Sequence, residues 1–445
     1  MSFVSRETIA APATPLGRAA IGVLRVSGPH TLLVIEALAG QCPKPREATL
    51  RWLKDPATGT QIDQALVLWF PKPHSFTGED SAEFHLHGGR LVMAAVLGVV
   101  TALKGCRAAE AGEFSRRAVL NGKLDLTQAE AIADLIDAET ERQSQQALRH
   151  LGGGLRDKVS AWVNTMTRVL ARWEAEIDFP DEGLPDAVGR ATIPQLAVLL
   201  TDLRRLMATA DQGERLREGV RMVVIGRPNA GKSLLFNRLA QRDVAIVTPV
   251  AGTTRDVLEV SFNLGGVSVV LADTAGIRDT DDQIEREGVR RAWQWADEAD
   301  LCLWVRDASR PGDAFGAVDG PVIEVWNKTD LADPPAPTDG GELLKVSALT
   351  GSGLDHLLAV LTDRANALVD AKADLLLTRE RHRRAIADAI AAITKAVQLA
   401  GVPEPAAEEV AECVRAALAA LGRLTGHVDV ERVLDHIFSE FCIGK

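Results

Sequence analysis

Short apolar runs separated by polar turns dominate the first 120 residues. Residues 20–26 and 65–70 are mostly apolar and rich in branched side chains, which is typical of strands. Residues 81–87 alternate polar and apolar positions, so we expect a half-buried strand there. A glycine pair then leads into a helical pattern at 90–103. This mixture predicts an α+β domain over residues 1–120.

Helix-forming segments on both sides of a strand-rich region indicate an interrupted domain. Thr127 and Glu130 have the spacing of a helix capping box, and helical patterns continue from there. We expect one all-α domain built from two chain segments, 121–216 and 379–445. A separate domain is inserted between them at 217–378. Exposed loops tolerate such insertions when the ends of the guest domain lie close together.

The inserted segment has a strand and helix order typical of α/β domains. Six apolar runs predict strands at 221–225, 257–264, 267–272, 301–305, 321–326 and 343–347. A Gly-Gly pair between the second and third runs favours a two-residue hairpin. Helical patterns separate the later runs. We therefore expect a mostly parallel sheet with helices on both faces.

Composition limits the class of protein. The 445 residues are 46% hydrophobic and 25% charged, which is ordinary for a soluble chain of two or three domains. The net charge is −11, yet residues 1–118 carry 13 Lys and Arg against 10 Asp and Glu. An RNA partner should therefore meet local basic patches.

Five scattered cysteines without a Cys-x-x-Cys pair argue against a disulfide framework or zinc site. The longest apolar run, 91–103, is too short to span a membrane, so we expect a cytoplasmic protein.

Residues 226–233 read Gly-Arg-Pro-Asn-Ala-Gly-Lys-Ser and fit the phosphate-binding loop G-x-x-x-x-G-K-[ST]. An apolar strand precedes the loop and a helical pattern follows it, as the motif requires. Main-chain N–H groups and a helix N-terminus would bind the phosphates. Lys232 would reach the β and γ phosphates, and Ser233 would hold Mg²⁺.

Three further motifs follow in the order expected of a guanine-nucleotide site. Asp273-Thr-Ala-Gly276 supplies an acid for the Mg²⁺ shell and a glycine at the γ phosphate. Asn327-Lys-Thr-Asp330 ends in a carboxylate that can accept from two guanine N–H donors, which adenine cannot offer as a pair. Ser347-Ala348 can present a main-chain N–H to the guanine oxygen. Together the motifs resemble those of Ras-like translation-factor-related GTPases.

The residue after the Asp-x-x-Gly motif departs from the Ras pattern. Ras-like enzymes can place a water-orienting glutamine there, whereas this chain has Ile277, which cannot polarise water. Hydrolysis must use another group, and Arg255, Arg278, Glu285 and a monovalent cation are all candidates. The alternative for the charged side chains is a solvated loop position. A cation could replace an arginine finger electrostatically.

Two smaller features stay open to ordinary interpretations. His85 and His87 share a strand face, but no third metal ligand is close in sequence, which favours a packing or surface pair. Cys442 lies fourth from the end without the C-a-a-X form that prenylation requires.

Motifs along nearly the whole chain resemble the MnmE (TrmE) family of tRNA-modification GTPases. They lie at 24–28, 75–80, 112–115, 123–137, 226–233, 251–256, 273–278 and 441–445, the last reading Phe-Cys-Ile-Gly-Lys. The resemblance implies an α+β folate-binding-like N-terminal domain that dimerises, a helical domain and an inserted Ras-like GTPase domain. The homodimer would act with a flavin protein, MnmG, on tRNA. Together they would add an aminomethyl-type (carboxymethylaminomethyl) group at C5 of the wobble uridine.

The resemblance also implies the cofactors and their ligands. A folate, 5-formyl- or methylene-tetrahydrofolate, would carry the one-carbon unit and contact Arg25, Glu83, Lys123 and Lys445. K⁺ would be held by Asn229, Thr248, Val250 and Thr253, and would stimulate GTP hydrolysis as the GTPase domains dimerise. Mg²⁺ would be held by Ser233 and Thr254. Glu285 would orient the attacking water through a second water, with Arg278 as a further catalytic candidate.

The remaining GTP contacts follow from the same motifs. They are Asn229, Ala230, Gly231, Lys232, Ser233, Leu234, Thr248, Pro249, Val250, Ala251, Gly252, Thr253, Thr254, Asp273, Thr274, Ala275, Gly276, Asn327, Lys328, Thr329, Asp330, Ser347, Ala348 and Leu349. The alternative function is a ribosome-assembly or structural switch GTPase without modification activity. The folate-like N-terminal domain argues against that alternative.

Overall fold

The computed structural model describes residues 6–178, 189–240, 258–273, 295, 298–311, 320–335, 343–369, 377–426 and 444. By its contacts the chain divides into two compact units. The first comprises residues 1–133, 150–174 and 414–445, and the second comprises 134–149 and 175–413. The domain boundaries expected at 120, 216 and 378 stay predictions.

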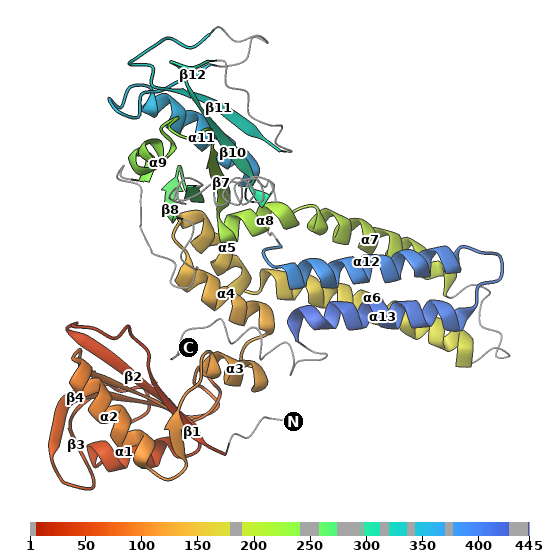
Figure 1. The fold of residues 1–445 in the computed structure, drawn as a ribbon. Coiled ribbons are helices and arrows are strands. Elements are labelled where there is room, and N and C mark those ends of the chain that lie inside the picture. The colour runs from red at the N-terminus through yellow and green to blue at the C-terminus, as the bar shows by residue number, and fades with distance from the viewer. Residues whose placement is uncertain are drawn as a thin grey trace, which may run out of the picture. The chain divides into compact units, whose positions relative to one another are not determined.

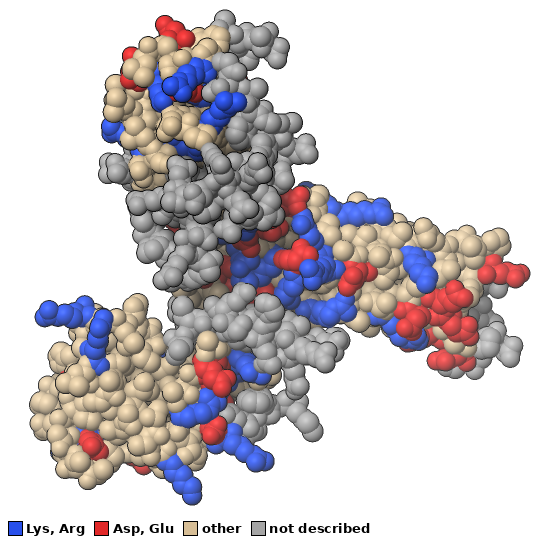
Figure 2. All heavy atoms as spheres, viewed as in Figure 1, with Lys and Arg blue, Asp and Glu red and all other residues tan. Residues whose placement is uncertain are grey.

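A six-stranded mixed sheet forms the N-terminal domain, with strand order β3-β4-β5-β2-β1-β6 (Figure 1). The strands are β1 (Thr8–Pro12), β2 (Ile21–Ser27), β3 (Thr49–Lys54), β4 (Gln61–Phe70), β5 (Ser81–His87) and β6 (Cys106–Ala108). Helices α1 (Thr31–Ala39) and α2 (Arg90–Ala102) pack on one face, where Val34, Val96 and Phe84 are fully buried. Helix α2 has no charged residue after Arg90, and Figure 2 shows a broad surface with few charged residues on this domain.

The opposite face of this sheet is covered only in part. Phe114 of α3 (Glu113–Leu120) is fully buried against Ile9 and Ala11 of β1. Farther along the sheet, Leu50 pairs with Leu66, and Leu66 pairs with His85. Leu50 and Leu66 are 55% and 40% exposed. This uncovered part, which we call the open face, carries the pocket described below.

The helical elements come from both chain segments, as expected. They are α4 (Leu126–Asp137), α5 (Glu141–Leu151), α6 (Gly154–Asp178), a 3₁₀ turn at Arg190–Thr192, α7 (Ile193–Met207), α8 (Ala210–Glu218), α12 (Glu380–Ala400) and α13 (Ala407–Thr425). Helix α7 packs along α12, although the two are far apart in sequence. None of the helices among the described residues has the length and apolar character needed to cross a lipid bilayer.

The cap of α4 differs from our expectation. Thr127 and Glu130 do not form the capping box; both are buried inside the helix. Instead, the Asp125 carboxylate accepts the main-chain N–H of Gln128 at 3.0 Å, and the Gln128 side chain accepts the N–H of Asp125 at 3.2 Å. The box therefore lies two residues earlier. Thr127 is turned inward, where its hydroxyl donates to Asp125 at 2.6 Å.

The inserted domain contains a second six-stranded sheet, with order β12-β11-β10-β7-β9-β8. Its strands are β7 (Val220–Ile225), β8 (Leu258–Leu264), β9 (Val267–Asp273), β10 (Leu301–Asp307), β11 (Val322–Asn327) and β12 (Leu344–Lys345). All pairings are parallel except that of β8 with β9. Helices α9 (Lys232–Ala240) and α11 (Leu354–Val369) contribute to its buried core. The expected strands are thus present, and β12 is shorter than predicted.

One carboxylate holds both chain connections of the inserted domain. Asp134 Oδ1 on α4 accepts from Arg217 Nε at 3.1 Å and from Arg379 Nη2 at 2.6 Å. Arg217 lies just before the first strand of the insert, and Arg379 directly precedes α12. The two ends of the insert therefore meet at the same oxygen atom.

Candidate functional site

The phosphate loop connects the end of β7 to the start of α9, as its motif requires. The Lys232 side chain is largely buried, and its Nζ donates to the main-chain carbonyl of Arg227 at 3.0 Å. Gly231 has φ = 93°, and a Cβ there would come within 2.2 Å of the Asn327 side chain. A side chain at this position would collide with the base-recognition motif. Asn229 also has a positive φ, of 63°, within the same loop.

Asn327 connects the phosphate loop to the loops expected to bind guanine. Its side chain is almost fully buried, and its Nδ2 donates to the carbonyl of Ala230 at 2.9 Å. Its Oδ1 accepts the main-chain N–H of Ala348, also at 2.9 Å. Three motifs that are far apart in sequence are thus joined by one amide group.

Asp330 is exposed beside these buried contacts, so its carboxylate is accessible to a base. Ser347 Oγ donates to Asp330 Oδ1 at 2.6 Å, which fixes the orientation of the carboxylate. The main-chain N–H of Thr329 donates to the carbonyl of Val346 at 3.2 Å. Leu349 is 65% exposed at the edge of the same loop. The arrangement leaves a polar carboxylate and an apolar side chain available to a ligand.

Lys328 is held by an acid that sequence reasoning missed. Its Nζ donates to Asp307 Oδ2 at 2.6 Å. Burial alone raises the pKa of Asp307, but hydrogen bonds from Lys328 and Ser309 outweigh burial and lower the net pKa below its usual range. Asp307 therefore stays ionised and positions the lysine. Asp307 ends β10, and the carboxyl end of a parallel strand is a position from which the sequence could have indicated a site residue.

Arg238 is a second residue that the sequence did not reveal. It lies near the end of α9 and donates to the carbonyls of Ala348 and Leu349 at 3.1 and 2.9 Å. The guanidinium thereby fixes the loop that presents these two residues. A single arginine in a helix carries no local signal of such a long-range contact.

Several predicted residues lie outside the described part of the chain. These are Thr248, Pro249, Val250, Ala251, Gly252, Thr253, Thr254, Arg255, Thr274, Ala275, Gly276, Ile277, Arg278, Glu285, Cys442 and Lys445. Their expected roles stay predictions. The described Ser233 and Leu234 lie in the first turn of α9, and Asp273 is the last residue of β9.

A pocket on the open face of the N-terminal sheet brings together Arg25, Glu83 and Lys123. Its volume is about 450 Å³, and the other lining residues are Arg46, Phe70, His74, Ser75, Phe76, Thr77 and Ser81. Arg25 and Glu83 are cross-strand neighbours on β2 and β5, and Arg25 Nη2 lies 3.0 Å from Glu83 Oε1. The guanidinium of Arg25 also lies 5.5 Å from the centre of the Phe76 ring. The pocket thus combines aromatic walls with charged groups.

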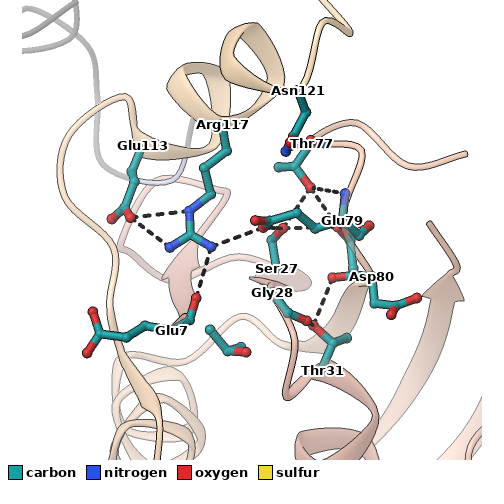
Figure 3. A network of polar contacts seen from close by, with 12 residues as sticks. Glu7, Ser27, Gly28, Thr31, Thr77, Glu79, Asp80, Glu113, Arg117 and Asn121 are labelled. Carbon is teal, nitrogen blue, oxygen red and sulfur yellow. Dashed lines mark hydrogen bonds and ion pairs between the residues drawn. The ribbon is translucent and has the colours of Figure 1, made fainter. Parts of the chain in front are cut away.

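A buried ionic network supports the loop that forms one side of this pocket (Figure 3). Arg117 of α3 donates to Glu113 at 2.9 Å and to Glu79 at 3.0 Å. Glu79 in turn accepts from Ser27 Oγ at 2.9 Å, and Ser27 Oγ lies 2.7 Å from the Thr77 hydroxyl. Because Thr77 lines the pocket, the network joins α3 to the pocket wall.

The charge state of Glu113 is set by its neighbours in this network. Burial alone raises its pKa, but hydrogen bonds from Arg107, the Glu110 main chain and Arg117 lower the net pKa below the usual range. Arg107 binds the carboxylate with two nitrogens, at 2.7 and 2.6 Å. The pKa of Arg107 is raised, chiefly by the hydrogen bond to Glu113. Glu113 is therefore a buried anion held by two arginines.

The two histidines of β5 have ordinary acidic partners. His85 Nε2 lies 3.4 Å from Glu83, and His87 Nδ1 lies 2.6 Å from Asp63. The described part of the chain has no group of three or more His, Cys, Asp and Glu residues placed to hold a metal ion. These contacts are those of a packing or surface pair, with the His87 side chain 74% exposed.

Gly444, next to the final lysine, is packed against the N-terminal domain. It is buried with φ = 104°, and a Cβ there would lie 2.0 Å from the carbonyl oxygen of Pro12. Pro12 ends β1, and its neighbour Ala11 pairs with Arg25. The geometry of this contact requires glycine, because any side chain would overlap the backbone of β1.

Two protein-family descriptions match the chain. "MnmE helical domain" matches residues 126–442, and "GTP-binding protein TrmE N-terminus" matches residues 8–123. The chain belongs to the MnmE family of tRNA modification GTPases. The family resemblance inferred from the motifs is therefore confirmed. So is the fold class, with an α+β N-terminal domain, a helical domain and an inserted Ras-like α/β domain.

Members of the MnmE family are similar to the chain along its length. A relative named tRNA modification GTPase MnmE from Methylorubrum populi is 51% identical over 446 residues, covering 99% of each chain. The relative of that name from Rhodospirillum rubrum is 49% identical over 461 residues, again covering 99% of each. That from Caulobacter vibrioides is 48% identical and covers 99% of this chain and 100% of its own.

Proposed function

We propose that this chain hydrolyses GTP as part of an enzyme system that modifies tRNA. With a flavin-dependent partner, MnmG, it adds an aminomethyl-type (carboxymethylaminomethyl) group at C5 of the wobble uridine. A folate supplies the one-carbon unit. The observation that carries the proposal is that one chain combines a guanine-nucleotide site with the pocket around Arg25, Glu83 and Lys123.

The nucleotide site fits GTP through the residues that are described. The Lys232 ammonium lies within the phosphate loop, and the exposed Asp330 carboxylate can accept from guanine. Ser233 lies in the first turn of α9, where its hydroxyl can hold Mg²⁺ together with Thr254. Mg²⁺ would neutralise phosphate charge when bound. The remaining phosphate contacts are proposed from the motifs at 248–254 and 273–276.

We propose that K⁺ binds beside the phosphate loop, held by Asn229 of that loop and by Thr248, Val250 and Thr253 of the later segment. The positive φ of Asn229 is compatible with this role, because it turns the local backbone away from the regular α-helical path. K⁺ would stimulate hydrolysis and accompany dimerisation of the GTPase domains. Equal turnover in K⁺ and Na⁺ would rule out this assignment.

The N-terminal pocket fits a reduced folate in size and chemistry. A volume of about 450 Å³ lies in the range of small-ligand sites. Glu83 can accept from the N–H groups of a pterin ring, and Phe76 can pack on its face. Lys445 is proposed as a fourth contact. The buried Gly444 beside β1 supports a position for the chain's end near this domain.

The open face of the N-terminal sheet supports a homodimer. Leu50, Trp52 and Leu66 lie on this face and are 55%, 50% and 40% exposed. Exposed apolar patches of this kind commonly mark protein interfaces. A second copy that covered these residues would also adjoin the pocket, because Leu68 pairs with Glu83 on the same face.

The proposed partners are tRNA and MnmG, and the proposed location is the cytoplasm, with no membrane partner. The test is nucleoside analysis of tRNA from a strain that lacks this chain, with and without the wild-type gene returned. Loss and recovery of the modified wobble uridine support the proposal. Unchanged wobble uridine would leave the alternative, a ribosome-assembly or structural switch GTPase.

A further inference from the structure

Two exposed cations at the mouth of the N-terminal pocket have no carboxylate partner among the described residues. Arg46 Nη2 donates to the carbonyl of His74, and Lys123 Nζ donates to the carbonyl of Pro73 at 3.1 Å. These carbonyls belong to consecutive residues, so the two cations lie close together. Deeper in the pocket, Arg25 is neutralised by Glu83. The uncompensated positive charge is therefore concentrated at the mouth.

The backbone around Arg46 is fixed in an uncommon conformation. Arg46 has φ = 61°, which few residues other than glycine adopt. Its main-chain N–H donates to the carbonyl of Trp69 on β4 at 2.8 Å. The guanidinium lies 5.7 Å from the centre of the Phe70 ring, which lines the pocket. A residue held in a disfavoured conformation beside a pocket is a candidate for a functional role.

The charge distribution selects the orientation of an elongated ligand. Of the described residues that line the pocket, Arg25, Arg46 and Lys123 are basic and only Glu83 is acidic. A neutral polar ring would bind beside the Arg25–Glu83 ion pair, and a carboxylate-bearing tail would extend toward Arg46 and Lys123. Reduced folates have this shape, and each γ-linked glutamate added to the tail adds one carboxylate.

We propose that the pocket selects polyglutamylated tetrahydrofolates, with Arg46 and Lys123 binding the carboxylates of the tail. This inference rests on the proposed use of folate. It adds Arg46 as a specificity-determining residue, and it names the form of the cofactor. Because the cations are exposed, the preference should weaken as salt concentration rises.

The test compares mono- and triglutamate forms of 5-formyltetrahydrofolate by calorimetry with the full chain. We expect the triglutamate to bind about tenfold more tightly, through added charge-assisted contacts. Arg46→Gln should reduce that ratio below about threefold, while Arg46→Lys keeps part of it. Lys44→Gln is the matched control, because Lys44 is 84% exposed, lies two residues away and is absent from the pocket lining. It should retain the full ratio.

The outcomes separate this inference from the proposed function. Equal affinity for both forms in the wild-type chain overturns the inference and leaves the use of folate intact. If neither form binds, both the inference and the proposed use of folate are wrong. If Arg46→Gln binds both forms with the wild-type ratio, Arg46 has no part in selection. If Arg46→Gln folds poorly, the ratio of triglutamate to monoglutamate affinity is measured for the wild-type chain at about 0.1 and 0.5 M salt. A ratio that salt does not change excludes an ionic contact with the tail.

Discussion

The side chain of Asn327 donates a hydrogen bond to the carbonyl of Ala230 at 2.9 Å, which joins the base-recognition motif to the phosphate loop. Asn327→Ala removes this bond and the one accepted from Ala348, and leaves two buried main-chain groups without these partners. Each such loss costs about 1–3 kcal/mol. We expect a lower melting temperature for the inserted domain and weaker nucleotide binding, measured by calorimetry. As a control, Asn263→Ala removes only a local bond to Gly266. Equal stability of the two variants would contradict the joining role.

Asp330 should determine the choice of base. Asp330→Asn replaces the carboxylate expected to accept from two guanine N–H groups. Loss of two charge-assisted hydrogen bonds should weaken GTP binding on the order of 100-fold. Xanthosine triphosphate, which has a carbonyl in place of the 2-amino group, should bind the variant better than GTP does. Asp333→Asn is the control, because Asp333 is 90% exposed three residues away. Retention of GTP preference in Asp330→Asn would exclude Asp330 from base recognition.

The Glu113 network should make the N-terminal domain sensitive to acid. Since the folded-state pKa of Glu113 is lowered, its stabilisation is complete above the unfolded-state pKa of about 4.3 and is lost as pH falls through the folded-state value. Glu113→Gln should lower the free energy of unfolding by about 3 kcal/mol at neutral pH, because two arginines lose their buried carboxylate. The variant should also lose less stability on acidification. Urea titrations from pH 7 to pH 3 measure both effects.

The control for Glu113 is Glu47→Gln. The Glu47 side chain is 61% exposed, and its contact with Lys44 is 3.9 Å long. We expect this change to lower the free energy of unfolding by less than about 0.5 kcal/mol. If the free energy of unfolding falls equally with decreasing pH in wild type and in Glu113→Gln, Glu113 does not control the pH dependence.

Asp134 should hold the two connections of the inserted domain. Asp134→Asn leaves Arg217 and Arg379 without their shared anion, and we expect a loss of roughly 1–3 kcal/mol in unfolding free energy. Faster hydrogen exchange should appear around α4 and at the start of α12. Glu218→Gln, which removes a longer and more exposed contact with Arg217, is the comparison. Identical exchange in both variants would remove Asp134 as the anchor.

Glu285→Ala should lower GTP turnover by at least about tenfold while nucleotide binding survives, as expected for a group that acts only in the transition state. Glu298→Ala provides a matched loss of charge at an exposed position. Single-turnover hydrolysis and nucleotide titration measure the two quantities. Near-normal turnover would show that Glu285 is a solvated loop residue without a role in hydrolysis.

The sequence predicted the strands of the inserted domain within a few residues because long runs of branched side chains form them. It missed β1, β3 and β6 in the N-terminal domain. Strand β1 is rich in alanine and ends in proline, β3 places Leu50 and Trp52 in an exposed row, and β6 has only three residues. Such strands form because neighbouring strands pair with them, which no local pattern reveals.

The chemical motifs were predicted better than the contacts that support them. Arg25, Glu83 and Lys123, which the family resemblance names as folate contacts, line one pocket, and their role in binding folate stays a prediction. Arg46, Arg238 and Asp307 act through partners that are about 20 to more than 100 residues away. Only folding brings these groups together. The capping box was misplaced because Thr127 and Asp125 both suit a helix start, and the burial of Thr127 decides between them.

The shared attachment of Arg217 and Arg379 to Asp134 has a consequence for protein engineering. Two guanidinium groups that contact one oxygen atom are separated by only a few ångströms, so the polypeptide leaves and rejoins the helical scaffold within two arginine side-chain lengths. A short glycine-serine bridge from residue 218 to residue 378 could therefore replace the whole nucleotide-binding module. The shortened chain would retain the N-terminal pocket and the helices. It would allow ligand binding to that pocket to be measured without any contribution from GTP.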